Sequence, residues 1–331
     1  MKILHVVGAR PNFPKLAPVH RAGVERGVDQ VILHTGQHYD EAMSTSFFES
    51  LGIPEPDVNL AVGSGSHAQQ TARMIERMEP VLLEQTPDWV VVYGDVNSTL
   101  AAAVVASKIG QRLAHVEAGL RSDDRTMPEE INRLVTDRLA SLLLTPSRDA
   151  DARLRAEGEP EAEIVFVGNV MVDTLMRTVA KLGLVRPATL PADAPVTVTL
   201  HRPSNVDDEA RLAQIVGALR EVSRTRPVVF AVHPRTAARL SAGGVDTAGI
   251  EILGAIPYED MLRRVIASAA VVTDSGGLQE ETTVLGVPCL TLRDNTERPV
   301  TITEGTNQLV RDMSAIPRLV AEAASAPARG R

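Results

Sequence analysis

The chain has 331 residues, which exceeds the usual size of one hydrophobic core and favours two domains of roughly 150 residues each. Its 34 basic and 42 acidic residues give a net charge of −8, so we do not expect nucleic acid as a partner. Cys289 is the only cysteine, no apolar stretch approaches the roughly 20 residues that cross a bilayer, and the metal-binding patterns CxxC and HExxH are missing. We therefore expect a cytoplasmic protein without metal or membrane insertion.

Short runs rich in Val, Ile and Leu alternate with longer amphipathic stretches, which is the rhythm of helices and buried parallel strands. The first half has predicted strands at Ile3 to Val7, Val31 to His34, Trp89 to Tyr93, Leu113 to Val116, Leu142 to Thr145 and Ile164 to Val167. The second half has them at Val196 to Leu200, Val228 to Val232, Ile250 to Leu253, Ala270 to Thr273 and Pro288 to Leu292. The predicted fold class is α/β, with two doubly wound, Rossmann-like domains.

A stretch rich in Pro and Ala, residues 181–195, is interpreted as a connection, because its three prolines discourage regular structure. We place the N-terminal domain in residues 1–168 and the C-terminal domain in residues 169–331. A cleft between two such domains is the usual place for a ligand.

The first predicted strand runs into Gly8-Ala9-Arg10-Pro11, and Lys15 follows in the next helix. Two cations beside a helix N-terminus predict an anion site, although they are also compatible with surface residues flanking a helix start. The pattern is not GxGxxG, so it gives no support for a nicotinamide or flavin cofactor.

Three carboxylates, Asp95, Glu117 and Glu129, follow predicted strands or open a helix. Carbon acid chemistry needs such a group, because one carboxylate removes a weakly acidic C–H proton while a protonated one serves a departing oxygen. Asp95 could instead cap a helix, and Glu129 and Glu130 could be favourable first-turn charges. Glu117 is harder to explain structurally, since it follows an apolar strand and precedes Ala-Gly.

Two histidines of the second half, His201 and His233, each follow a predicted strand and are each close to an arginine. A lone histidine is usually structural, but two such groups at successive strand ends favour a phosphorylated ligand. Of the two, His201 is the stronger functional candidate.

The motif Asp274 to Glu281, DSGGLQEE, follows a strand and opens a helix. Gly276 and Gly277 let backbone N–H groups approach a diphosphate, and the hydroxyl of Ser275 adds a donor. Glu281, one turn further on, is placed to bind ribose hydroxyls, and Arg298 in a later loop adds positive charge. A plain loop before a capped helix would leave the Gln-Glu-Glu run unexplained.

Nine motifs resemble, in order and spacing, those of the non-hydrolysing UDP-N-acetylglucosamine 2-epimerases: GARPNFPK, TGQHYDEAM, YGDVNSTLAAA, HVEAGLRS, MPEEINR, TLHRPSN, VHPRT, DSGGLQEE and RDNTERP. The resemblance implies the GT-B architecture, a homodimer, and a UDP-sugar substrate held between domains without any cofactor. It also implies a reaction in which UDP is eliminated anti across C1 and C2 to give a 2-acetamidoglucal and adds back from the other face, supplying precursors of cell-surface polysaccharide.

The resemblance also assigns residues. It implies catalytic roles for Asp95, Glu117, Glu129 and His201. It implies substrate contacts for Arg10, Lys15, Arg133, Ile256, Met261, Ser275, Gly276, Gly277, Glu281 and Arg298. Which carboxylate carries each proton stays open, because coupled groups titrate together.

Three departures from the family pattern leave details open. Asn12 and Ser204 each stand where the family commonly has glutamate, which leaves the exact hexose open. No Trp/Phe-Asp-Gly segment follows Val310, so whether the extreme C-terminus packs back on the N-terminal domain is also open.

Alternative functions share the same fold. A hydrolysing 2-epimerase lacks HVEAG, a GT-B glycosyltransferase has no need for the carboxylate cluster, and a binding module needs neither the cluster nor His201. Epimerases of UDP-diacetamido-uronates or UDP-6-deoxy sugars keep the same core motifs, so these substrates remain alternatives to UDP-N-acetylglucosamine.

Overall fold

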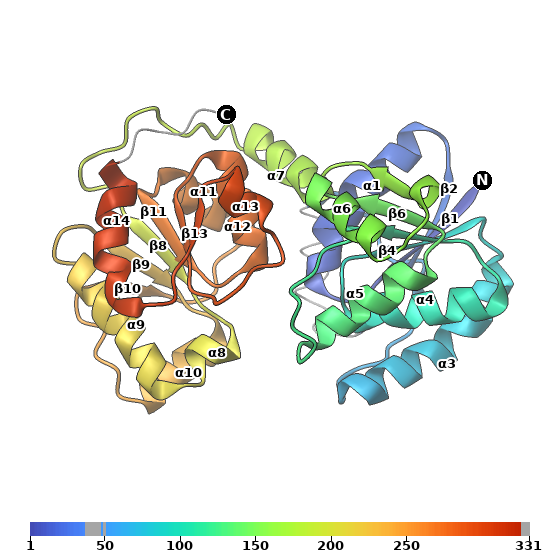
Figure 1. The fold of residues 1–331 in the computed structure, drawn as a ribbon, viewed down its shortest axis with the longest axis horizontal. Helices are drawn as coiled ribbons and strands as arrows, with labels where there is room; N and C mark the ends of the chain where they lie inside the picture. Colours follow the sequence, from blue (N-terminus) through green and yellow to red (C-terminus); the bar gives the residue numbers. More distant parts are fainter. Residues whose placement is uncertain (37–47, 49–50, 326–331) are drawn as a thin grey trace. The chain divides into compact units, whose positions relative to one another are not determined.

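The computed structural model describes residues 1–36, 48 and 51–325; the side chain of Arg10 and most of the TGQHYDEAM motif lie outside this description. The chain divides into two compact units, Met1–Thr174 and Leu175–Arg331, which we call unit 1 and unit 2. The division falls within helix α7 (Val170–Lys181), six residues after the predicted boundary at residue 168. Each unit has one sheet with helices on both faces (Figure 1).

Unit 1 contains a parallel sheet of seven strands in the order β3-β2-β1-β4-β5-β6-β7. The strands are β1 (Lys2–Val7), β2 (Asp29–His34), β3 (Val58–Asn59), β4 (Trp89–Tyr93), β5 (Leu113–Val116), β6 (Leu142–Thr145) and β7 (Ile164–Phe166). The helices described with them are α1 (Phe13–Glu25), α3 (His67–Gln85), α4 (Asn97–Ile109), α5 (Pro128–Leu139), α6 (Arg148–Ala156) and the start of α7, with short 3-10 turns at Arg10–Asn12 and Glu161–Glu163.

The sheet of unit 1 is buried on both faces, which explains why its strands are apolar runs without alternation. Along β4, Val90 and Val92 pack into one core cluster with α3 and α4. Val91 and Tyr93 point the other way, into a second cluster with Phe13 and Leu16 of α1. The residues of β4 from Val90 to Tyr93 therefore all pack against a helix layer.

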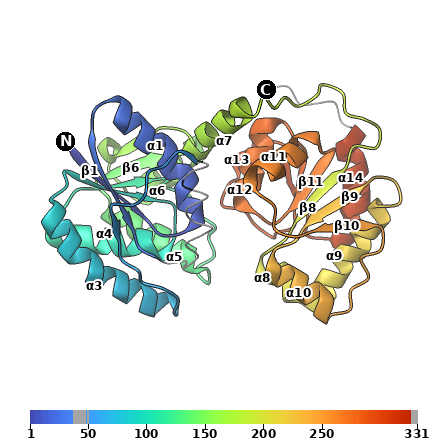
Figure 2. The same cartoon turned by 180° about the vertical axis from the view of Figure 1, so that it is seen from behind.

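Unit 2 repeats this plan with a parallel sheet of six strands in the order β10-β9-β8-β11-β12-β13, seen from behind in Figure 2. The strands are β8 (Val196–Thr199), β9 (Val228–Ala231), β10 (Ile250–Leu253), β11 (Ala270–Thr273), β12 (Cys289–Thr291) and β13 (Asn307–Leu309). The helices are α8 (Pro203–Val206), α9 (Glu209–Val222), α10 (Pro234–Ala242), α11 (Tyr258–Ala267), α12 (Gly276–Leu285), α13 (Val300–Thr303) and α14 (Ile316–Ser325), with a 3-10 turn at Met313–Ala315.

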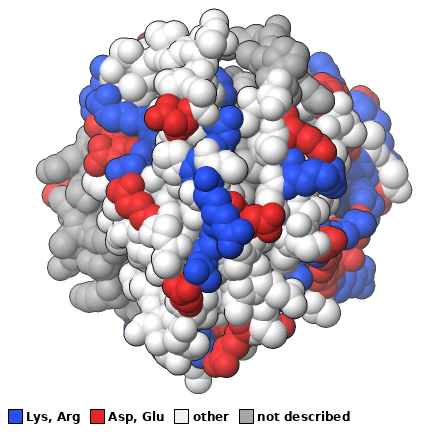
Figure 3. All heavy atoms as spheres, turned by 90° about the vertical axis from the view of Figure 1, so that its left-hand side faces the viewer, with Lys and Arg blue, Asp and Glu red and all other residues white. Residues whose placement is uncertain are grey.

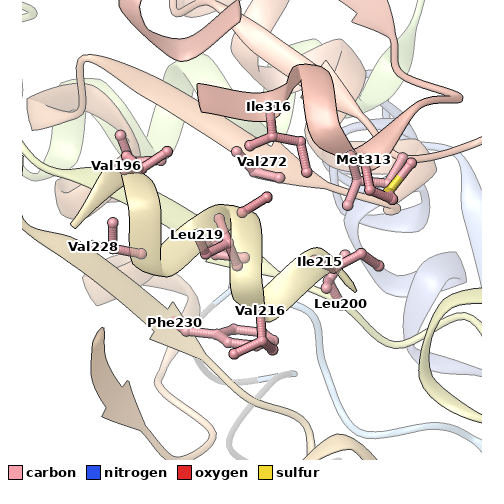
Figure 4. Packing of buried hydrophobic residues seen from close by; sticks show 14 of the residues in the cluster. Val196, Leu200, Ile215, Val216, Leu219, Val228, Phe230, Val272, Met313 and Ile316 are labelled. Carbon is pink, nitrogen blue, oxygen red and sulfur yellow. The ribbon is translucent and has the colours of Figure 1, made fainter. Parts of the chain in front are cut away.

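The main core of unit 2 lies between its sheet and the helices α9 and α14. Figure 4 shows Ile215, Val216 and Leu219 of α9 beside strand residues and Ile316 of α14, all buried. The last described helix therefore packs on unit 2. Residues 326–331 lie outside the described residues, so the packing predicted for the extreme C-terminus stays a prediction.

Two edge strands were not predicted from the sequence. β3 (Val58–Asn59) and β13 (Asn307–Leu309) have two and three residues and lie at the ends of their sheets. Both strands contain polar residues, so they do not form the apolar runs by which buried strands are recognised in a sequence. An edge strand pairs with one neighbour only.

Both sheets reverse their strand order at a point that fixes where a ligand site can form. In unit 1 the connections go in opposite directions from β1 and β4, and in unit 2 from β8 and β11. The loops at the carboxyl ends of two such strands run in opposite directions. A crevice forms between these loops, and it is the usual ligand site of this fold. The motifs GARP, HRPS and DSGG follow β1, β8 and β11, and YGDV begins at Tyr93, the last residue of β4.

No helix in the described part of the chain is long and apolar enough to cross a membrane. On the face of the molecule shown in Figure 3, basic side chains are interspersed with acidic ones. That face has no continuous basic surface of the kind that binds nucleic acid.

We expect the unit 2 core to be sensitive to truncation of Leu219, which is fully buried in α9. Leu219→Ala should lower the free energy of unfolding by about 2–5 kcal/mol, because it leaves a cavity as well as losing apolar burial. Leu83→Ala, at an exposed position of α3, is the matched control and should cost less than about 1 kcal/mol. Urea unfolding of both variants tests this, and equal losses would contradict the described core.

Candidate functional site

The β1 turn in unit 1 is packed too tightly for any side chain at Gly8. A Cβ there would overlap the hydroxyls of Thr35 and Ser98, which hydrogen bond to each other at 2.9 Å. Asn12 holds the turn from inside: its Oδ1 accepts from the N–H groups of Gly8 and Ala9, and its Nδ2 donates to the carbonyl of Tyr93. Asn12, a departure from the family pattern, is thus a buried structural link between the β1 and β4 ends.

Glu117 lies directly after β5 and forms a buried ion pair with Lys15 of α1. Its backbone has φ of 75°, which an L-residue adopts at a cost of order 1 kcal/mol or more and which is typical of functional positions. Gly94, at the end of β4, makes room for the pair, since a Cβ there would lie 2.6 Å from Lys15 Nζ. The structure therefore brings Lys15 and Glu117, two predicted site residues, together beside Gly94 of the YGDV motif.

Asp95 is held by Arg133, whose Nε and Nη2 lie 3.0 and 2.8 Å from Asp95 Oδ2. Arg133 also binds Glu130 at 2.5 Å, and Glu130 accepts hydrogen bonds from the N–H and hydroxyl of Ser122. Burial opposes ionisation of Glu130, but Ser122 and Arg133 together hold its pKa below the ordinary value. Glu130 is thus a structural carboxylate, whereas Asp95 remains one-third exposed at the crevice.

Glu129 lies in the first turn of α5, and its side chain is half-buried. Within the described residues it has no hydrogen bond or ion pair, in contrast to its neighbour Glu130. A carboxylate with this freedom can take part in proton transfer.

A chain of hydrogen-bonded ionisable side chains next to Glu117 was not predicted from the sequence. His115 of β5 contacts Asp137 of α5 at 2.5 Å, and Asp137 also accepts from Arg121, which binds Glu157 through two hydrogen bonds. Burial opposes ionisation of Asp137, yet His115 and Arg121 hold its pKa below the ordinary value. The available signal was a histidine inside an apolar strand, LAHV, which needs a polar partner when buried.

In unit 2, His201 follows β8 and its Nδ1 lies 3.0 Å from the buried carboxylate of Asp274, which follows β11. Asp274 also accepts from the backbone N–H groups of His201 and Arg202 and from Asn205. Burial opposes its ionisation, but the hydrogen bonds from His201, Asn205 and Arg202 lower its pKa. The bond at Nδ1 orients the imidazole, and about half of the His201 side chain is exposed for a ligand. His233, by contrast, caps α10 by accepting from the N–H of Arg235.

The start of α12 is surrounded by arginines. Ser275 is its N-cap, and a Cβ at Gly276 would lie 2.9 Å from Glu297 Oε1 and 3.0 Å from Arg298 Nη1. Glu297 pairs with Arg298 at 2.5 Å and with the buried Arg293 at 2.8 Å. Burial opposes ionisation of Glu297, but these arginines lower its pKa to about 2.

Each residue of the Gln-Glu-Glu run in α12 has its own partner. Gln279 accepts from Thr296 and Asn307, and so holds the loop that carries Arg298. Glu280 lies 2.9 Å from Arg298 Nε. Gln279 and Glu280 therefore have a structural role, because both bind the loop that carries Arg298.

Glu281 accepts a hydrogen bond of 2.9 Å from the hydroxyl of Tyr258, a residue that sequence reasoning did not select. Burial, opposed by the hydrogen bond from Tyr258 and assisted by the neighbouring Glu280, raises the pKa of the Glu281 carboxyl to about 7. Ile256 and Met261 lie in the segment around Tyr258 and are half-buried; Met261 packs against the core of unit 2. Their predicted contact with a base stays a prediction.

The chain has two doubly wound units. One carries carboxylates, and the other has a glycine-rich, arginine-lined helix start where its strand order reverses. This combination is typical of α/β enzymes that act on nucleotide-linked substrates. A sequence model of the UDP-N-acetylglucosamine 2-epimerase family matches residues 21–329. The chain belongs to this family, and its architecture is that of the GT-B epimerases.

Relatives and solved structures agree with this assignment. The UDP-N-acetylglucosamine 2-epimerase of Methanocaldococcus jannaschii is 43% identical over 94% of this chain and 89% of the relative. The UDP-2,3-diacetamido-2,3-dideoxy-D-glucuronate 2-epimerase of Pseudomonas aeruginosa is 44% identical over 95% of this chain and 90% of the relative. The M. jannaschii epimerase solved with UDP-GlcNAc and UDP has a TM-score of 0.89 at 40% identity, covering 100% of this chain and 96% of that one. The Neisseria meningitidis epimerase bound to UDP-GlcNAc has a TM-score of 0.87 at 27% identity, covering 97% and 91%.

The raised pKa of Glu281 predicts a pH-dependent effect on stability. The Glu281 carboxyl has a pKa of about 7 in the folded protein and an ordinary, lower pKa in the unfolded chain. Its contribution to the free energy of unfolding therefore falls as pH rises from the lower value to the higher one, and it stays constant above about pH 8. Glu281→Gln should therefore gain stability relative to the wild type between pH 5 and 8, as measured by urea unfolding. Glu84→Gln, at an exposed position, is the control; the same pH trend in both variants would refute the buried, protonated carboxyl.

Proposed function

We propose that this protein inverts C2 of a UDP-linked 2-acetamido sugar, interconverting UDP-N-acetylglucosamine and UDP-N-acetylmannosamine. Family membership supports the reaction class. The observation that carries the proposal is Glu117, a buried carboxylate in a left-handed conformation next to Lys15 and at the same sheet edge as Asp95. A strained backbone of this kind is typical of active sites and ligand clamps, and here it carries a carboxylate.

The residues of unit 2 are proposed to bind the UDP moiety. The N-terminus of α12, with Ser275, Gly276 and Gly277, offers N–H groups to a diphosphate, and Arg298 supplies charge beside them. Glu281 is proposed to bind ribose hydroxyls, for which it must present acceptor oxygens. Ile256 and Met261 are proposed to contact the base, and His201 to act on the sugar or diphosphate.

The residues of unit 1 are proposed to carry out the chemistry. One carboxylate removes the proton from C2 while the C1–O bond to UDP breaks, which forms the C1–C2 double bond of a 2-acetamidoglucal. UDP then adds back to C1, and a proton is delivered to C2 on the opposite face. Asp95, Glu117 and Glu129 are the proposed acid and base groups, and Arg10, Lys15 and Arg133 are proposed to neutralise charge near them.

The proposed steps move one proton and one UDP, and they leave the oxidation state of the sugar unchanged. The reaction as written therefore needs no redox cofactor. We also propose a cytoplasmic homodimer that supplies precursors of cell-surface polysaccharide, which light scattering and a gene deletion can test.

The relative from P. aeruginosa, named for a diacetamido-glucuronate, supports one alternative substrate. Its identity to this chain is as high as that of the N-acetylglucosamine enzyme from M. jannaschii, so identity does not select between the two sugars. A comparison of kcat/KM for both UDP-sugars decides which hexose is used.

Incubation with UDP-N-acetylglucosamine in heavy water, without added cofactor, tests the reaction. We expect epimerised product that carries deuterium at C2, because the carbanion-like or glucal species takes its proton from a group that exchanges with solvent. Proton NMR of the C2 position measures this. Product with undiluted protium at C2, or turnover only with added NAD, would overturn the elimination mechanism.

Replacement of single carboxylates tests their roles. Asp95→Asn, Glu117→Gln and Glu129→Gln should each lower kcat by at least about a hundredfold, the ordinary contribution of a general acid or base, with the fold intact by circular dichroism. Glu84→Gln should leave kcat unchanged. Normal turnover by Glu117→Gln would show that the central carboxylate has been assigned incorrectly.

A further inference from the structure

Two side chains of the buried chain His115–Asp137–Arg121–Glu157 contact the backbone of the Asp95 turn and of the Glu117 turn. His115 Nε2 lies 2.8 Å from the carbonyl of Gly94, the residue before Asp95. Asp137 Oδ2 accepts from the N–H of Gly119, two residues after Glu117, at 3.1 Å. One pair of side chains thus holds the two turns that carry Asp95 and Glu117.

Both ring nitrogens of His115 face acceptors. The carbonyl of Gly94 has no proton to give, so Nε2 must donate to it. Asp137 accepts hydrogen bonds from the N–H of Gly119 and from the guanidinium of Arg121, which favour its ionised form. Because Nδ1 of His115 then faces a carboxylate that can only accept, Nδ1 also donates. The imidazole is then a cation, and the chain alternates in sign from His115 to Glu157, which leaves the buried group neutral as a whole.

We propose that His115 and Asp137 are a positioning pair, in which an imidazolium and a carboxylate that do not touch the substrate fix the turns of Asp95 and Glu117. The proposal rests on the proposed function for the roles of these two carboxylates. Glu117 is held in an unfavourable backbone conformation, and such a conformation persists only where its surroundings fix it. The hydrogen bonds to Gly94 and Gly119 provide this restraint at both turns.

The matched experiment compares two buried aspartates on neighbouring helices. Asp137→Asn weakens the hydrogen bonds to His115 and Gly119. Asp151→Asn in α6 changes a carboxylate that binds Thr145 and Arg148 and makes no hydrogen bond to either turn. We expect Asp137→Asn and His115→Gln to lower kcat about 10- to 100-fold, with KM within about threefold, because small misplacements of reacting groups act on the chemical step. Asp151→Asn should lower the thermal midpoint similarly but keep kcat within about threefold.

Glu157→Gln gives a graded control at the outer, partly exposed end of the chain and should lower kcat by less than about threefold. If the folded Asp137→Asn protein loses no more kcat than Asp151→Asn, or if the loss lies only in KM, the positioning role is wrong.

Nitrogen-15 NMR of the wild-type imidazoles gives a readout that needs no activity. We expect His115, assigned by its absence in His115→Gln, to show protons on both ring nitrogens, and we expect Asp137→Asn to lose the proton on Nδ1. One protonated nitrogen in the wild type would overturn the proposal. A wild type with both protons but without epimerase activity would instead refute the proposed function and leave the hydrogen bonds of the pair intact.

Discussion

The buried ion pair between Lys15 and Glu117 is the interaction on which the unit 1 site depends. A buried charge without its partner costs several kcal/mol, so the fold must deliver both groups to the same place. Lys15 comes from α1 and Glu117 from the end of β5, and Gly94 of β4 leaves the space in which they meet. Three segments far apart in the sequence are therefore fixed by one requirement for charge neutrality.

The two units handle charge in opposite ways. Unit 1 presents carboxylates, two of which are paired with Lys15 or Arg133. Unit 2 gathers Arg293 and Arg298 and places one carboxylate, Glu297, between them. The first arrangement is typical of proton transfer, and the second keeps the arginines separated and oriented, as the proposed diphosphate site requires.

The sequence predicted the fold class and the longer strands because parallel strands buried on both faces are continuous apolar runs, as at β4 and β11. Residues such as Asp95 and Ser275 became candidates because they lie two residues after the ends of those runs. The sequence did not predict Asp137 or Tyr258, which lie within helices and act through partners far along the chain, His115 and Glu281. Such pairings depend on how helices pack on the sheet, which no local pattern encodes.

The tight β1 turn has a consequence for how this protein can vary. Any replacement of Gly8 adds a carbon where the hydroxyls of Thr35 and Ser98 already meet, so a single change there has no room. A smaller residue at position 35 or 98 would leave the other hydroxyl without its buried partner, which is also costly. Replacement of Gly8 would therefore require the side chains of Thr35 and Ser98 to shift or to change with it.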